Sequence, residues 1–388
     1  MNMRVNRQEI ISSSPSLFNM NKIKGISLRK RTHHNHNDDV NDMIQICNNN
    51  IDLNDVIDRI NVMKRLEETS YVAQGFFNKW EEHNQRVITN NNHQPIPSII
   101  IKGDGCYVSE ARSNINNDAL NEFYRSFMCK WSYQLIDYLQ VDREVVAVAF
   151  SYVDRLLETH YYCAKKVFRL AIVTSIYLAN NLLTSTDLPL EKVTNLCRNE
   201  FTTKMIVQMK MIILQTFNYN LHPPTSKSFI EHLCAFLPSE DVSMSTKQHI
   251  IQQSYFLVEL SIYDYYFVDQ NPSIIAFAAI VNVIQDLSID TFAEIPRYTF
   301  IHHMSHILNI HSHSVCITMI QQRLDDLYKK SKQYAVDTTN KISSLKKHND
   351  HQQGLISSTN KDLCVRRCSS EIELNSIVNN NASVGLRY

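Results

Sequence analysis

The sequence predicts an all-α fold, with two five-helix bundles in tandem between disordered tails. Glycine is scarce, at 6 of 388 residues, whereas sheet-rich folds and phosphate-binding loops need more glycine in their turns. Apolar residues recur with a 3.6-residue period from Asp118 to Leu327, which indicates amphipathic helices. Pro223 and Pro224 interrupt this pattern near its middle and divide the helical sequence into two halves.

Both ends of the chain are predicted to be disordered, over residues 1–50 and 331–388. They contain polar runs such as His33-His34-Asn35-His36-Asn37 and Asn379-Asn380-Asn381, and they cannot bury enough apolar surface to offset the conformational entropy of folding. Between the first tail and the first bundle, residues 51–117 are expected to form an N-terminal helix and then a polar loop around Asn90-Asn91-Asn92.

The first bundle is expected over residues 118–222. Its five predicted helices contain the segments Tyr124–Tyr138, Val145–Leu156, Phe168–Ala179, Leu188–Cys197 and Thr203–Phe217. The third segment is apolar nearly all round and includes small residues, which is typical of a helix at the centre of a bundle. We therefore predict that Ala171, Ser175 and Leu178 are inaccessible to solvent.

The second bundle is expected over residues 223–330, where Thr225 or Ser226 can cap its first helix. Its predicted helices contain the segments Phe229–Phe236, His249–Tyr263, Ser273–Ile284, Thr291–Thr299 and Val315–Leu327. The third segment again mixes small and large apolar residues, so we predict that Ala276 and Ala279 are buried. The two halves thus repeat one arrangement of helices with little sequence identity.

Composition and charge count against several classes of function. The chain has 39 basic and 39 acidic residues, so no overall basic field attracts nucleic acid. The nine cysteines form no Cys-x-x-Cys pair, which argues for reduced thiols inside the cell rather than a disulfide framework or a zinc module. The longest apolar run, Ile274–Val281, is too short to cross a membrane. We expect a soluble protein without metal, cofactor, nucleic acid or membrane contact.

Local motifs follow one another in order between about residues 60 and 328. Arg125 stands six residues before Trp131, and the run Tyr152-Val153-Asp154-Arg155-Leu156-Leu157 follows. The first half closes on Pro223-Pro224-Thr225, and the second contains Val258-Glu259-Leu260-Ser261 and then Pro272-Ser273. In this order and spacing the chain resembles the cyclin family. The resemblance implies a non-catalytic regulatory subunit that binds and activates a cyclin-dependent serine/threonine protein kinase in cell-cycle control.

The resemblance also implies roles for residues of the first two helices. Arg125 and Asp154 are expected to form a buried ion pair that joins these helices. A docking groove for short peptide motifs of kinase substrates is expected at the matching positions Tyr124, Met128, Trp131 and Gln134. Trp131 fits an ordinary core position equally well.

Kinase contacts are expected at the third helix, the turn after it and the short fourth helix. The matching positions are Lys165, Lys166, Thr184, Val193 and Leu196. Thr184 stands where the family has a glutamate, and Lys210 replaces a further family glutamate in the fifth helix. A charge-assisted hydrogen bond is therefore missing, and we expect either a weaker complex than is usual in the family or a divergent kinase.

Two alternatives within this fold and one outside it remain open. The chain could serve transcription machinery, as a relative of the factor that bridges promoter and polymerase, or be a divergent cyclin that has lost kinase activation. A scaffold of stacked helix pairs would show three or more repeats of about 34 to 47 residues, whereas only two halves are present. Residence in the nucleus and cytoplasm is expected, and the partner kinase and cell-cycle phase are left open.

Overall fold

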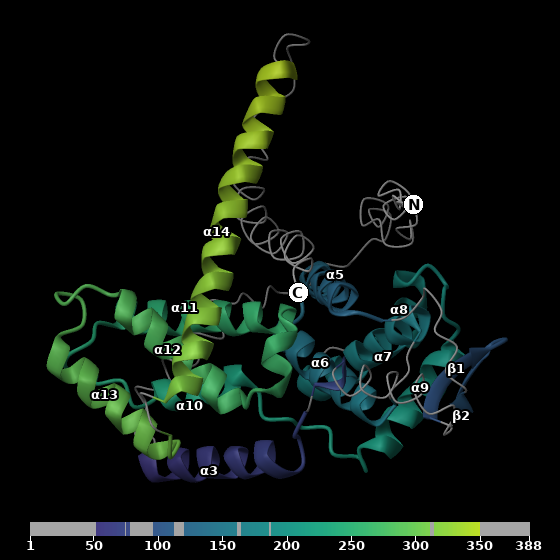
Figure 1. The fold of residues 1–388 in the computed structure, drawn as a ribbon, viewed down its shortest axis with the longest axis horizontal. Coiled ribbons are helices and arrows are strands. Elements are labelled where there is room, and N and C mark those ends of the chain that lie inside the picture. The colour runs from purple at the N-terminus through teal and green to yellow at the C-terminus, as the bar shows by residue number, and fades with distance from the viewer. Residues whose placement is uncertain are drawn as a thin grey trace, which may run out of the picture.

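The computed structural model describes residues 52–73, 75–77, 96–111, 120–160, 164–185, 188–310 and 314–349. The predicted tails at residues 1–50 and beyond residue 349 lie outside the described residues. The described part is mostly helical and its sheet is limited to a two-stranded hairpin, which confirms the all-α prediction. Two bundles lie side by side, the first on the right and the second on the left (Figure 1).

Ten helices make up the two bundles in the described part of the chain. The first bundle contains α5 (Glu122–Leu139), α6 (Glu144–Thr159), α7 (Lys165–Leu183), α8 (Leu190–Leu196) and α9 (Thr203–Thr216). The second contains α10 (Ser226–Cys234), α11 (Met244–Tyr263), α12 (Pro272–Asp286), α13 (Glu294–Ile307) and α14 (Val315–Asn349). A short 3-10 helix, η3 (Tyr265–Asp269), joins α11 to α12.

Local sequence determines where several of these helices begin. The side chains of Asn121, Thr202, Thr225 and Ser243 each accept a hydrogen bond from a backbone N–H group in the first turn of α5, α9, α10 and α11 respectively. Such caps satisfy donors that a helix cannot pair internally. Thr225 was one of the two predicted caps, and it follows the double proline directly.

The central helices have the predicted burial. Ala171, Ser175, Leu178, Ala276 and Ala279 are all buried, with at most 8% of their surface exposed. This confirms the prediction that α7 and α12 lie at the centres of their bundles.

An N-terminal helix, α3 (Leu53–Thr69), lies along the lower edge of the second bundle (Figure 1). Val56 and Ile60 are its buried apolar residues. Glu67 near its end is also buried, and its carboxylate accepts hydrogen bonds from the backbone N–H (3.0 Å) and hydroxyl (2.5 Å) of Ser273 in the first turn of α12. A carboxylate at a helix N-terminus is favourable, so Glu67 fastens α3 to the second bundle.

The predicted polar loop before the first bundle contains a β-hairpin instead. Strands β1 (Ile96–Lys102) and β2 (Gly105–Ala111) pair antiparallel around a turn at Gly103, where φ is 63°. Ile99 and Cys106 are buried. The backbone N–H of Cys106 donates to the Gln208 side-chain oxygen on α9 (2.9 Å). The sequence contains a pattern typical of a hairpin, namely apolar residues on both sides of a two-residue turn with glycine first. The asparagine run before it led to the prediction of a loop.

Two helix boundaries of the second bundle also differ from the prediction. The helix expected at Thr291–Thr299 begins only at Glu294, because Pro296 suits the first turn of a helix, where its missing N–H is not needed. The last helix continues to Asn349, so residues 331–349, predicted to be disordered, are helical. Its far end projects away from the second bundle (Figure 1).

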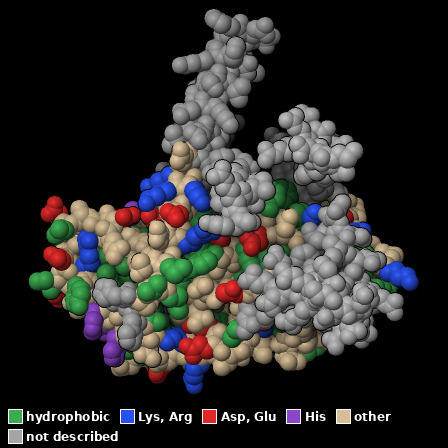
Figure 2. All heavy atoms as spheres, viewed as in Figure 1, with side chains coloured by type: hydrophobic (Ala, Val, Ile, Leu, Met, Phe, Trp, Pro, Cys, Tyr) green, Lys and Arg blue, Asp and Glu red, His purple; other side chains and the backbone are tan. Residues whose placement is uncertain are grey.

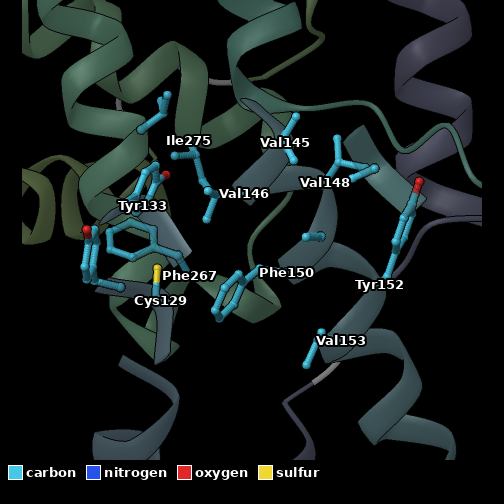
Figure 3. Packing of buried hydrophobic residues seen from close by; sticks show 14 of the residues in the cluster. Cys129, Tyr133, Val145, Val146, Val148, Phe150, Tyr152, Val153, Phe267 and Ile275 are labelled. Carbon is cyan, nitrogen blue, oxygen red and sulfur yellow. The ribbon is translucent and has the colours of Figure 1, made fainter. Parts of the chain in front are cut away.

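A buried interface joins the two bundles. Residues of both bundles lie together in this core, as Figure 3 shows: Cys129, Tyr133, Val146, Phe150, Phe267 and Ile275. The Tyr133 ring stacks on that of Tyr263 at 5.4 Å between centroids. Arg143 at the start of α6 forms an ion pair with Glu259 of α11 (3.3 Å). The interface therefore combines apolar packing with charge pairing.

Beside this interface, the Glu231 carboxyl group of α10 lies near other carboxylates. Burial, and to a lesser extent the neighbouring Glu144 carboxylate, raises the pKa of Glu231 to about 7. Tyr255 donates a hydrogen bond to Glu231 (3.1 Å). Lys227 is engaged mainly by Asp142 (2.8 Å) and also by Glu144 (3.6 Å). The ionised form of the Glu231 side chain is therefore disfavoured in the folded protein, compared with the unfolded chain.

Glu231→Gln is expected to stabilise the protein at pH 8 and to have little effect at pH 5. The raised pKa means that the folded protein holds a proton that the unfolded chain releases, so the parent loses stability as pH rises from about 4.5 to about 7. A neutral glutamine still accepts from Tyr255 and avoids a cost of about 1–3 kcal/mol. Denaturant melts of both proteins from pH 5 to pH 8 measure this, and a constant difference across that range would contradict it.

Candidate functional site

Arg125 and Asp154 form a buried, bidentate ion pair between α5 and α6. Arg125 donates from Nε to Asp154 Oδ1 (2.8 Å) and from Nη2 to Oδ2 (2.6 Å), and both residues are at most 5% exposed. Its remaining Nη1 donates to the backbone oxygen of Ile262 in α11 (2.8 Å). The guanidinium also lies 5.1 Å from the centroid of the Phe150 ring. Arg125 thus joins three helices and both bundles, beyond the two helices that the sequence predicted.

The predicted substrate groove is only partly available at the surface. Met128 is fully buried and Trp131 is 4% exposed, so both residues belong to the core, which agrees with the core position that Trp131 fitted equally well. They lie on the face of α5 that packs against the rest of the bundle. Tyr124 and Gln134 are half-buried, and their role in substrate docking stays a prediction.

The two lysines at the start of α7 have different surroundings. Lys166 is exposed, whereas Lys165 is half-buried and its ammonium lies 5.6 Å from the centroid of the Tyr124 ring. Nearby, Arg169 of α7 forms an ion pair with Glu200 and donates to the Tyr124 hydroxyl (2.8 Å). Lys166 is therefore the lysine whose charge is presented to solvent, whereas Lys165 lies beside Tyr124 at the start of α5.

The apolar contacts predicted from α8 are not available to a partner. Val193 and Leu196 are 5% and 8% exposed and belong to the hydrophobic core, so the expectation that they form a contact surface is wrong. Both face inward because α8 is a short helix that covers the bundle with its apolar side. Thr184 ends α7, and its hydroxyl donates to the backbone oxygen of Asn180 (2.8 Å).

An exposed apolar face on α9 was missed by the sequence analysis. Val207 and Met211, one turn apart, are 42% and 41% exposed, and Leu183 at the end of α7 is 41% exposed. Lys210 directly precedes Met211 on α9, and its ammonium lies 5.7 Å from the centroid of the Tyr177 ring of α7. We call these four residues the α9 face. The sequence of α9 does indicate such a face. Its apolar residues occur nearly all round the helix, although α9 is not the central helix of the bundle, so some of them are left uncovered.

Family comparisons agree with this architecture. A model of the cyclin N-terminal domain matches residues 105–222, and a model of the cyclin C-terminal domain matches residues 224–353. The chain belongs to the cyclin family. Cyclins are regulatory subunits of protein kinases rather than catalysts, and this two-box cyclin is a member of that family.

Similar proteins include cyclins of several organisms. The G1/S-specific cyclin-D1 of Mus musculus is 24% identical over 210 residues, which cover 53% of this chain and 68% of that protein. The G1/S-specific cyclin CCN1 of Candida albicans is 26% identical over 181 residues, covering 40% and 25% of the two chains. Among solved structures, a viral cyclin from herpesvirus saimiri matches with a TM-score of 0.44 at 16% identity, covering 53% of this chain and 85% of that one.

The described residues of this cyclin offer neither a metal-binding cluster nor a membrane-spanning helix. They contain no group of three or more histidine, cysteine, aspartate or glutamate side chains placed to hold a metal ion. None of the described helices is long and apolar enough to span a bilayer. Basic and acidic side chains are interspersed over the face drawn in Figure 2.

Proposed function

We propose that this cyclin binds and activates a cyclin-dependent serine/threonine kinase in cell-cycle control, through the α9 face and the start of α7. The observation that carries the proposal is the exposure of Val207, Met211 and Leu183 in the N-terminal cyclin domain. Exposed apolar side chains that lie close together mark binding surfaces in soluble proteins. Such residues become the energetic centre of an interface when a partner covers them.

The charges around this surface indicate the kind of kinase it fits. Lys166 is exposed at the start of α7, and Lys210 lies on the α9 face at a position where the family has a glutamate. Thr184 offers no carboxylate, and its hydroxyl is engaged within α7. A kinase with acidic groups opposite these lysines would gain attraction that steers association, so the partner should be a divergent kinase with an acidic cyclin-binding surface.

Replacing Lys165 and Lys166 together by glutamate is expected to weaken kinase binding at least about tenfold, because two attractive charges become repulsive. The test is affinity purification of the tagged parent from dividing cells, identification of the co-purified kinase, and a pull-down of that kinase with each variant. The single variant Lys166→Glu measures how much the exposed lysine contributes to kinase binding without a change at the half-buried Lys165. Lys332→Glu, exposed on α14, is the matched control.

Four results distinguish the possible outcomes. Phosphorylation of a peptide substrate by the complex supports activation, whereas binding without activity would favour a divergent cyclin that has lost activation. Co-purification of transcription machinery in place of any kinase would favour the transcriptional alternative. Full kinase binding by a well-folded Lys165→Glu/Lys166→Glu protein would place the contact elsewhere.

A further inference from the structure

A cavity of about 630 Å³ lies between the two bundles. Ala147 and Phe150 of α6 line one side of it, and Val258 and Ile262 of α11 line the other. Val72, which also lines the cavity, is 41% exposed, so the cavity is reached from solvent. Its volume falls in the range of ligand pockets. None of the α9 face, the α7 lysines or the predicted groove residues lines it, so it is separate from those surfaces.

Acidic groups outnumber basic groups around this cavity. Seven carboxylates and three basic side chains line it. Glu144 and Glu259 lie on opposite bundles, on α6 and α11. Lys227 and Arg143 pair with them at 3.6 Å and 3.3 Å. Three lining carboxylates, those of Glu67, Asp264 and Asp269, have no cationic counterpart among the lining residues, although Asp264 pairs with Arg323 of α14 (2.6 Å). In a partly desolvated cavity this excess attracts a cation more strongly than it would on an open surface.

Two polar groups at the cavity have hydrogen-bonding capacity to spare. The hydroxyl of Tyr133 is buried without a hydrogen-bond partner among the described residues, and so is Nη2 of Arg143. Both residues line the cavity, and the Arg143 guanidinium lies 4.7 Å from the centroid of the Tyr133 ring. Buried polar groups are normally paired. A backbone carbonyl entering the cavity would supply the acceptor that both groups lack.

We propose that the cavity between the bundles binds a short segment of a partner protein that carries an arginine or lysine between apolar residues. The basic side chain lies among the carboxylates, the segment's backbone accepts hydrogen bonds from Arg143 and Tyr133, and its apolar neighbours contact Phe150 and Ile262. A peptide is the ligand class that supplies a cation, carbonyl acceptors and apolar groups together. This site binds a second partner and does not depend on where the kinase docks.

The test uses fluorescein-labelled nine-residue peptide libraries and the full-length protein. One library has arginine fixed at the centre, one has leucine and one has glutamate, and the flanking positions vary among valine, leucine, proline and alanine. Fluorescence anisotropy is expected to show binding of the arginine library at least tenfold tighter than that of the glutamate library. Equal binding of the two libraries, or no binding of the arginine library, would overturn the proposal.

Substitutions on α6 locate the binding. Ala147→Arg places a bulky cation in the cavity and should weaken binding of the arginine library at least tenfold. Ser151→Arg, one turn further along α6 and also lining the cavity, provides a second variant if the first does not fold. Ile295→Arg on α13, where Ile295 is 80% exposed, is the matched control and should bind as the parent does. Parent-like binding by a folded Ala147→Arg or Ser151→Arg protein would refute the site.

The chain's own basic segment, Arg29-Lys30-Arg31, is the competing occupant. Its replacement in the variant R29S/K30S/R31S should leave binding of the arginine library unchanged if the cavity serves a partner. Binding that becomes at least tenfold tighter in this variant would show that the N-terminal tail occupies the cavity, and the assignment to a partner would be wrong.

Discussion

Asp154→Ala is expected to lower the free energy of unfolding by about 3–5 kcal/mol, the largest effect of any single substitution considered for this cyclin. The change leaves the Arg125 guanidinium buried between α5, α6 and α11 without a counter-charge, and only its bond to the Ile262 backbone oxygen remains. Arg125→Ala should lower the free energy of unfolding by a similar amount. It leaves the Asp154 carboxylate buried without a counter-charge and removes a hydrogen bond to the Ile262 backbone oxygen. Urea melts of the purified proteins measure both effects.

A double variant separates the stranded charge from the lost pair. Arg125→Met/Asp154→Leu removes both charges and fills the space with apolar groups, so it should be more stable than either alanine variant. The matched control is Lys204→Ala, which breaks an exposed ion pair with Asp104 (3.1 Å) between α9 and the hairpin. Exposed pairs contribute about 0–1 kcal/mol. Melting midpoints of both alanine variants equal to that of the parent would show that the buried pair does not hold the bundles together.

The helical architecture was predictable because it depends on local patterns. The 3.6-residue period, the double proline and the small residues of α7 and α12 located the two bundles and their central helices. The pairing of Arg125 with Asp154 was expected from the resemblance to the cyclin family rather than from a local pattern. The bond from Arg125 to Ile262 could not be predicted, because it depends on how the second bundle docks against the first.

Exposure of individual side chains was the least predictable property. Periodicity shows that a helix has an apolar face, but it does not show which neighbour covers that face. Met128 and Val193 were therefore assigned to binding surfaces although both are buried, while Val207 and Met211 were assigned to no surface although both are exposed. Glu67 was missed as well, because its partner Ser273 lies 206 residues further along the chain.

Val207→Asp/Met211→Asp is expected to reduce kinase binding at least about 100-fold while leaving the fold intact. Apolar side chains at the centre of an interface often contribute 2 kcal/mol or more each, and about 1.4 kcal/mol corresponds to a tenfold change in affinity. Carboxylates at these positions add a desolvation cost when a partner covers them. In the free cyclin both positions are already more than 40% exposed, so stability should change by less than about 1 kcal/mol.

A matched double substitution on the other bundle makes this result specific. Ile295 and Tyr298 of α13 are 80% and 67% exposed, so Ile295→Asp/Tyr298→Asp introduces the same charge at two exposed positions of a helix outside the proposed surface. This control should bind the kinase as the parent does, by surface plasmon resonance with the co-purified kinase. If the α9 variant melts like the parent and still binds with undiminished affinity, the exposed apolar face of α9 does not contact the kinase. In that case Lys165 and Lys166 would have to mark a docking surface that does not include α9.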